Sequence, residues 1–151
     1  MALKDDPRRL LPEAYARGIT VPTRFADMDP NRHLNNVAVL QLCEECRVRF
    51  NLTMRRDHPA VGHPRFVVAH VSVDYLAEGQ YPHDVEVRLA AGDIGRTSYR
   101  IRQALFQTIR GERTCFALTD TIMVHRTDDM RPAPIPDALR EALTTYAFRA
   151  V

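Results

Sequence analysis

The chain has 151 residues, of which 45% are apolar and 26% charged, and its formal net charge is +2 at pH 7. This composition is typical of a folded globular protein and excludes a disordered one, while the mild charge argues against a nucleic-acid partner. No apolar run approaches the roughly 18 residues of a membrane span, so we expect no membrane partner. The charged N-terminus "MALKDDPRRLLPEAYARG" lacks the apolar segment of a secretory signal, so we expect a cytoplasmic protein.

The first predicted elements are a short strand and a long helix. Residues 17–26 read as a strand that Pro22 interrupts, so we expect it at the edge of a sheet. A helix is predicted over residues 36–52, with Asn35 or Asn36 as its cap. Its apolar residues recur at steps of three and four on a wide face, which predicts that other structure encloses the helix: Val37, Val39, Leu40, Leu42, Cys43, Cys46 and Phe50.

Two of the three cysteines, Cys43 and Cys46, form a C-x-x-C motif within this helix, and Cys115 lies far from them. An odd number of cysteines without a secretory signal argues against a disulfide framework. A zinc site would need a second cysteine pair or suitably spaced histidines, and a redox pair usually lies at a helix N-terminus. We therefore expect Cys43 and Cys46 to be buried side chains, and we expect no metal site.

Four further strands and a second helix are predicted after a loop at residues 53–65. The strands are expected at residues 66–76, 83–91, 96–108 and 113–126, where β-branched residues and alternation of apolar with polar residues are clearest. The links between them are short, which implies that successive strands are antiparallel neighbours. A proline-rich break then leads to a helix over residues 137–146 with Asp137 as its cap.

One long apolar helix followed by a meander of antiparallel strands predicts an α+β fold in which the sheet wraps around the helix. Neither a repeat nor a linker divides the sequence, so we expect a single domain over residues 1–151. One sheet on one helix leaves its outer strands exposed, and a second copy would cover some of that surface. We therefore expect a homodimer, or a dimer of dimers that makes a homotetramer.

The segment "ADMDPNRHLNNVAVLQLCEECR", residues 26–47, resembles hotdog-fold thioesterases of the 4-hydroxybenzoyl-CoA thioesterase and acyl-ACP thioesterase type. The segments "VDYLAEGQYPHDVEVRL", "GRTSYRIRQALF" and "PAPIPDALREAL" are similar to the strands and tail that follow in that family. The D-x-D-P-N-x-H-x-N-N run is the more specific part of the resemblance, and the later matches are generic. The resemblance implies a hotdog fold and the hydrolysis of an acyl-CoA or acyl-ACP thioester. It implies no cofactor other than coenzyme A as part of the substrate.

The resemblance also implies candidate catalytic residues. Asp29 matches the catalytic carboxylate of the family, and Asn31 and His33 match two further positions of the acyl-ACP branch. That branch has a glutamate after the following strand, where this chain has Glu78. The neighbouring cysteine of the family is Gly79 here, so no thiol nucleophile is implied.

Elementary chemistry of the same segment agrees with thioester hydrolysis. The reaction needs an activated water or another nucleophile, and donors for the developing oxyanion. The first turn of a helix offers unpaired N–H groups, so we expect the backbone of Asn35 or Asn36 to polarise the thioester carbonyl. Asp29 would attack the carbonyl or act as general base, Asn31 would orient the water or the carboxylate, and His33 would donate to the carbonyl or tune Asp29. Glu78 is an alternative general base.

Each of these residues also has a purely structural interpretation. Asp29 before proline is a common turn residue, Asn36 a common helix cap, and His33 and Glu78 could be structural or turn residues. Weaker candidates for substrate contacts are Leu34, Val37, Phe66, Val68, Arg96 and Ser98. Two other functions remain open: a non-catalytic protein that binds acyl thioesters, and a hotdog dehydratase or hydratase.

Overall fold

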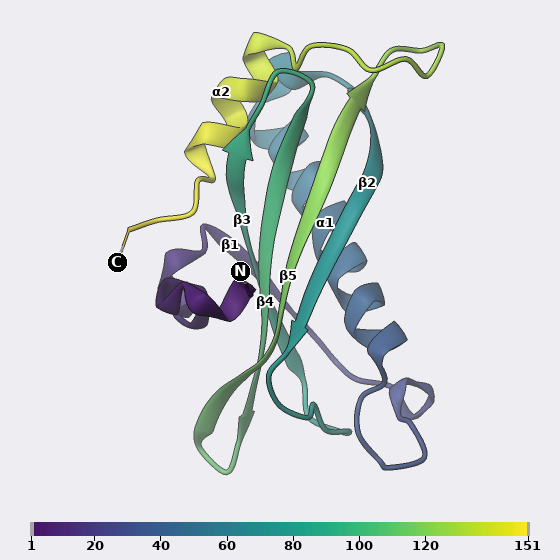
Figure 1. Cartoon of the computed structure of the whole chain (residues 1–151), viewed down its shortest axis with the longest axis vertical. Coiled ribbons are helices and arrows are strands. Elements are labelled where there is room, and N and C mark those ends of the chain that lie inside the picture. Colours follow the sequence, from purple (N-terminus) through teal and green to yellow (C-terminus); the bar gives the residue numbers. More distant parts are fainter. Residues whose placement is uncertain (1, 151) are drawn as a thin grey trace.

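The computed structural model describes residues 2–150 and shows one antiparallel sheet that curves around a long helix (Figure 1). The strand order is β1-β3-β4-β5-β2. The strands are β1 (Arg17–Val21), β2 (Arg65–Tyr75), β3 (Val85–Ile94), β4 (Ser98–Ile109) and β5 (Glu112–Arg126), and the helices are α1 (Asn36–Asp57) and α2 (Asp137–Thr145). The predicted α+β architecture and the edge position of the first strand are therefore confirmed, and β3, β4 and β5 are successive antiparallel neighbours as expected. The predicted pairing of β2 with β3 was wrong, because β2 pairs with β5 and the connection over residues 76–84 is long enough to cross to β3.

Helix α1 is longer than the sequence pattern indicated. The loop predicted to begin at residue 53 begins only after Asp57, so this boundary was wrong. Met54 explains the extension, because its side chain is 1% exposed and belongs to the core. Pro59 then limits the helix, since proline cannot continue the helical hydrogen-bond pattern.

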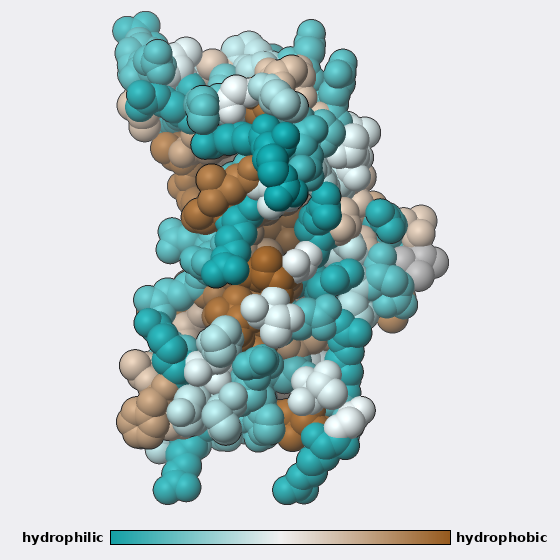
Figure 2. Space-filling model, turned by 180° about the vertical axis from the view of Figure 1, so that it is seen from behind, coloured by the Kyte–Doolittle hydropathy of each residue, from teal (hydrophilic) through white to brown (hydrophobic). Residues whose placement is uncertain are grey.

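The apolar face of α1 is divided between the core and the surface. Val39, Leu42, Cys43, Cys46 and Phe50 are buried as predicted. Val37 and Leu40 are 57% and 39% exposed, so their assignment to the enclosed face was wrong. The backbone of α1 approaches β3 and β1 most closely, which places the helix over one side of the sheet. Figure 2 shows the consequence, because hydrophobic patches interrupt the hydrophilic surface on the face that carries α1.

Strand β2 forms the other edge of the sheet and differs from β1 in length and exposure. It has 11 residues, pairs only with β5 among the described strands, and carries exposed Val68, Ala69 and His70. A long edge strand of this kind presents unpaired backbone groups to a partner.

Helix α2 and the N-terminal segment complete the fold. Pro136 occupies the N-cap position of α2 and no side chain caps it, so the predicted capping role of Asp137 was wrong. On the outer face of the sheet, short 3-10 turns before β1 bring the buried Arg9 to Asp120 at 2.7 Å. In residues 2–150, neither helix combines the length and hydropathy that a membrane span requires.

Candidate active site

The polar segment before α1 folds into a tight two-stranded loop. The N–H of Asn35 donates to the carbonyl oxygen of Asp27 at 2.8 Å, and the N–H of Asp29 donates to that of His33 at 2.8 Å. Arg32 closes the turn with φ 65°, in the left-handed region. The loop therefore turns Asp29 back toward the residues that lead directly into the helix.

The carboxylate of Asp29 is held by the backbone of its own loop. Its Oδ1 accepts hydrogen bonds from the N–H of Asn31 at 2.8 Å and from the N–H of His33 at 3.0 Å. No described residue donates a hydrogen bond to Oδ2. This is the turn geometry expected of an aspartate before proline, and it leaves one carboxylate oxygen without a protein partner. The structure is thus compatible with both the turn role and the catalytic role of Asp29.

His33 and Glu78 come together from different parts of the chain. The Nε2 atom of His33 lies 2.9 Å from an Oε atom of Glu78. The main chain supports this contact, because the N–H of Leu34 donates to the carbonyl oxygen of Gly79 at 2.8 Å. The sequence proposed roles for both residues but contained no signal for their pairing. Asn31 is exposed, and its side chain forms no hydrogen bond with any of residues 2–150.

The start of α1 separates the two predicted oxyanion donors. The side chain of Asn35 caps the helix by accepting the N–H of Ala38 at 2.7 Å. The N–H of Asn35 is already bonded to Asp27, so its assignment as an oxyanion donor was wrong. For the N–H groups of Asn36 and Val37, the described part of the chain supplies no acceptor. Asn36 therefore keeps its candidate role, and Val37 is a second candidate donor that the sequence analysis missed.

Asp27 anchors this loop to the rest of the chain. Its carboxylate accepts the N–H of Arg24 and pairs with the Arg24 guanidinium at 2.8 Å. Burial opposes ionisation of Asp27, but the hydrogen bonds and charge of Arg24 outweigh it and hold the pKa of this carboxyl below its ordinary value. These contacts give Asp27 a structural role in the loop.

Comparison with known proteins decides the family. The family model described as the thioesterase-like superfamily matches residues 23–143, which include the loop, α1 and the whole sheet from β2 onward. The chain belongs to the thioesterase-like superfamily. A search of curated proteins finds no significant match.

Solved structures of this superfamily share the fold. A thioesterase from Thermus thermophilus, complexed with coenzyme A and Zn, is 29% identical over 92% of this chain and 99% of that chain, with a TM-score of 0.75. A predicted thioesterase from Bacillus stearothermophilus is 26% identical over 89% and 98% of the two chains, with a TM-score of 0.74. A 4-hydroxybenzoyl-CoA thioesterase variant complexed with 4-hydroxybenzoyl-CoA is 12% identical over 84% and 97%, with a TM-score of 0.74, which supports the hotdog fold alone. The predicted hotdog fold is therefore confirmed.

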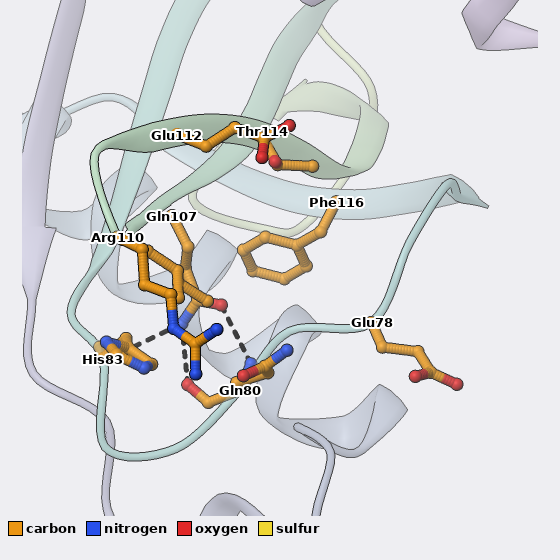
Figure 3. A pocket seen from close by; sticks show the side chains of 9 residues that line it. Glu78, Gln80, His83, Gln107, Arg110, Glu112, Thr114 and Phe116 are labelled. Atoms are coloured by element: carbon orange, nitrogen blue, oxygen red, sulfur yellow. Dashed lines mark hydrogen bonds between the residues drawn. The ribbon is translucent and has the colours of Figure 1, made fainter.

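A cavity of about 690 Å³ opens beside Glu78, the partner of His33 (Figure 3). Its walls come from the β2–β3 connection and the β4–β5 hairpin. Gln107 crosses between them, donating to the carbonyl oxygens of Gln80 and His83 at 2.9 and 3.0 Å. Glu78 lies at the margin of the cavity with its carboxylate directed away from Phe116. Asp29 does not line this cavity, and within one chain the Asp29 loop meets the cavity wall through the His33–Glu78 pair and a backbone bridge between His33 and Gln80.

The weaker substrate candidates fall into two groups. Leu34 is buried beneath Gly79, and Val37 is exposed on the first turn of α1, so both lie beside the loop. The other four lie toward the end of the sheet away from Tyr75. Phe66 is near the start of β2, Ser98 begins β4, and Arg96 is in the turn before β4. Val68 is seven residues, roughly 23 Å of strand, from Tyr75. Within one chain the structure therefore does not bring these four residues to the Asp29 loop.

The cysteines are placed as packing residues. Cys43 and Cys46 are buried in the core, and burial raises the pKa of Cys43 to about 11 and that of Cys46 to about 12. Thiols of this kind stay protonated at neutral pH and are poor nucleophiles. Among residues 2–150, no three His, Cys, Asp or Glu side chains are grouped in a way that could hold a metal ion.

Proposed function

We propose that this protein hydrolyses an acyl-CoA or acyl-ACP thioester to a free acid and a thiol. The observation that carries the proposal is that the carboxylate of Asp29 is fixed by the loop that runs directly into the open N–H groups at the start of α1. A thioester placed there would meet a carboxylate and oxyanion donors together. Membership of the thioesterase-like superfamily and structural likeness to a thioesterase solved with coenzyme A support the same reaction.

Asp29 acts in one of two ways in this proposal. As general base it takes a proton from water while the water oxygen bonds to the acyl carbon. The resulting tetrahedral oxyanion collapses, breaks the carbon–sulfur bond and releases the thiolate, which takes up a proton. As nucleophile Asp29 bonds to the acyl carbon and expels the thiolate, and water then cleaves the mixed anhydride. Neither route needs a cofactor beyond the coenzyme A of the substrate.

The neighbouring groups position and polarise the reactants. The N–H groups of Asn36 and Val37 receive the oxyanion, helped by the positive end of the helix dipole. Glu78 orients His33, which places its ring beside the Asp29 loop. The Asn31 side chain is free to bind the attacking water or the carbonyl.

We further propose that the protein acts as a homodimer formed along β2. A two-fold axis relating two such edges makes the paired strands antiparallel. This arrangement brings the Phe66 end of one β2 toward Tyr75 of the other copy, and so returns the weaker candidates Phe66 and Val68 of the partner subunit to the site. The exposed apolar side chains Val37 and Leu40 of α1 would be covered at the same time.

The test is thiol release from a panel of acyl-CoA substrates, comparing the wild type with Asp29→Asn. We expect release with at least one acyl-CoA and its loss in the variant, with an unchanged melting temperature. Saturable binding without release would identify a non-catalytic acyl-thioester-binding protein, and hydration of an enoyl-CoA would identify a hydratase. Either result would replace the proposal.

A further inference from the structure

Arg47 is a cation between α1 and the sheet that has no carboxylate partner among residues 2–150. Its Nη1 donates to Oε1 of Gln103 at 3.2 Å and to Oγ1 of Thr121 at 3.4 Å, both long contacts to neutral groups. None of the ion pairs formed by the described residues includes Arg47. Arg47 is only partly exposed, and a partly desolvated cation without a counter-ion is a costly arrangement that an anionic ligand would relieve.

The guanidinium remains within reach of a ligand. A guanidinium has five N–H donors, and the contacts to Gln103 and Thr121 engage only Nη1. The Nε and Nη2 atoms are not among the buried nitrogens without partners, which means that solvent contacts them. Two adjacent donors of this kind match the two oxygens of a carboxylate.

Arg47 lies on the same side of α1 as a strip of apolar side chains that starts at the helix mouth. Val71 and Val73 of β2 pair with Thr121 and Thr119 of β5. These two threonines face α1, because they contact Arg47 and Cys43, so Val71 and Val73 face α1 as well. The strip is completed at the helix mouth by exposed Val37, Leu40 and Tyr75.

The two ends of this strip are set by two contacts. The hydroxyl of Tyr75 lies 3.5 Å from the carbonyl oxygen of Asn36, which places Tyr75 beside the proposed oxyanion donors. At the other end, Val71 pairs with Thr121, which contacts Arg47. Val71 is four residues, or about 13 Å of strand, from Tyr75. The spacing along the helix is similar, because Arg47 lies 11 residues, or roughly 16 Å of rise, beyond Asn36. Side chains on a helix point toward its N-terminus, which shortens the distance from Arg47 to the helix mouth.

We propose that Arg47 selects acyl groups that carry a carboxylate at the end remote from the thioester. This inference rests on the proposed thioesterase function. The thioester carbon lies at the start of α1, the methylene chain runs along the apolar strip, and the distal carboxylate pairs with Arg47. Glu44 is exposed on the same side of the helix and forms no ion pair with Arg47. Its negative charge weakens the attraction of the site for an anion.

The test compares suberoyl-CoA with octanoyl-CoA, which has the same number of acyl carbons and a methyl end. In the wild type we expect a higher kcat/KM for suberoyl-CoA. Arg47→Met should lower kcat/KM for suberoyl-CoA by about 10- to 100-fold, the range of a charge-assisted hydrogen bond, and change that for octanoyl-CoA less than about threefold. Arg47→Lys should retain part of the preference, and Glu44→Gln, which removes a nearby exposed charge, should retain or increase it.

Equal kcat/KM values for the two esters in the wild type, or an equal loss for both in Arg47→Met, would overturn the inference. If either result is found and octanoyl-CoA is still hydrolysed, the proposed thioesterase function stands and only the role of Arg47 fails. If neither ester is hydrolysed, the proposed function fails, and titration calorimetry with the same two esters decides the role of Arg47. Tighter binding of suberoyl-CoA that Arg47→Met removes would support it, and equal dissociation constants would overturn it.

Discussion

The imidazole Nε2 of His33 lies 2.9 Å from the carboxylate of Glu78, across 45 positions of the chain. A carboxylate at this distance favours the histidine tautomer with its proton on Nε2 and leaves Nδ1 as an acceptor. The pair joins the Asp29 loop to the β2–β3 connection and gives Glu78 an orienting role.

Glu78→Gln tests whether this orienting role is sufficient. The amide oxygen still accepts a hydrogen bond from His33, so we expect kcat to fall less than about 10-fold, whereas Asp29→Asn should lower it by roughly 10²- to 10⁴-fold. Thiol release under saturating substrate measures both. A larger loss in Glu78→Gln than in Asp29→Asn would make Glu78 the general base instead.

Asn36→Pro tests the backbone donor at the start of α1. Proline is well tolerated at the first position of a helix, and Asn35 already has the extended conformation that a following proline requires. The variant removes the N–H proposed to bind the oxyanion together with the Asn36 side chain, and we expect kcat to fall about 10²- to 10³-fold with the fold retained.

Asn36→Ala is the matched control, because it keeps the N–H and should keep near wild-type kcat. Circular dichroism checks the helix in both variants. Equal activity of the proline and alanine variants would remove Asn36 from the oxyanion site.

Gly79 is required by the close approach of two buried side chains. A Cβ atom at this position would lie 2.8 Å from Cδ1 of Leu34 and 3.0 Å from a ring carbon of Phe116. Gly79→Ala should therefore lower the free energy of unfolding by about 1–3 kcal/mol and displace the loop that holds His33. Urea denaturation measures this against Gly95→Ala, where the nearest atom is 3.4 Å away and little change is expected.

Stability at acidic pH should depend on Asp27. Its pKa is lower in the folded protein than in the unfolded chain, so its contribution to stability is complete above the unfolded pKa, near 3.9, and is lost as the pH falls through the folded value. Asp27→Asn should lower the free energy of unfolding at pH 7 by about 1.5–3 kcal/mol and reduce its decline below pH about 4. Urea denaturation at several pH values measures this, and a decline as steep as that of the wild type would contradict it.

The edge of β2 should hold two copies together. Analytical ultracentrifugation of the wild type is expected to show a dimer. Val68→Asp places a charge on the exposed edge strand and should weaken the dimer and lower kcat. Val48→Asp, at a side chain with a similar 50% exposure on the side of α1 near β1 at the opposite edge of the sheet, should leave both unchanged. A monomeric wild type with full activity would contradict the proposed dimer.

The sequence alone was sufficient for the type and order of the elements and for the family. Alternation in β3 and the steps of three and four in α1 report local burial, and the loop before α1 carries its turn chemistry in Asp29 and Pro30. These features depend on neighbours within a few positions, so a single chain read in order reveals them. The end of α1 was missed because Met54 packs into the core, and the residues next to it in the sequence do not predict this packing.

Only the tertiary structure decided which candidate groups are available for chemistry. The N–H of Asn35 is engaged by Asp27, the pairing of His33 with Glu78 joins two separate loops, and Val37 and Leu40 face outward because α1 lies over β1 and β3. Arg47 meets the neutral side chains of Gln103 on β4 and Thr121 on β5, and no described residue supplies it with a counter-ion. The Asn35–Asp27 bond closes a loop of nine residues, whereas the other outcomes depend on contacts between residues that are distant in sequence.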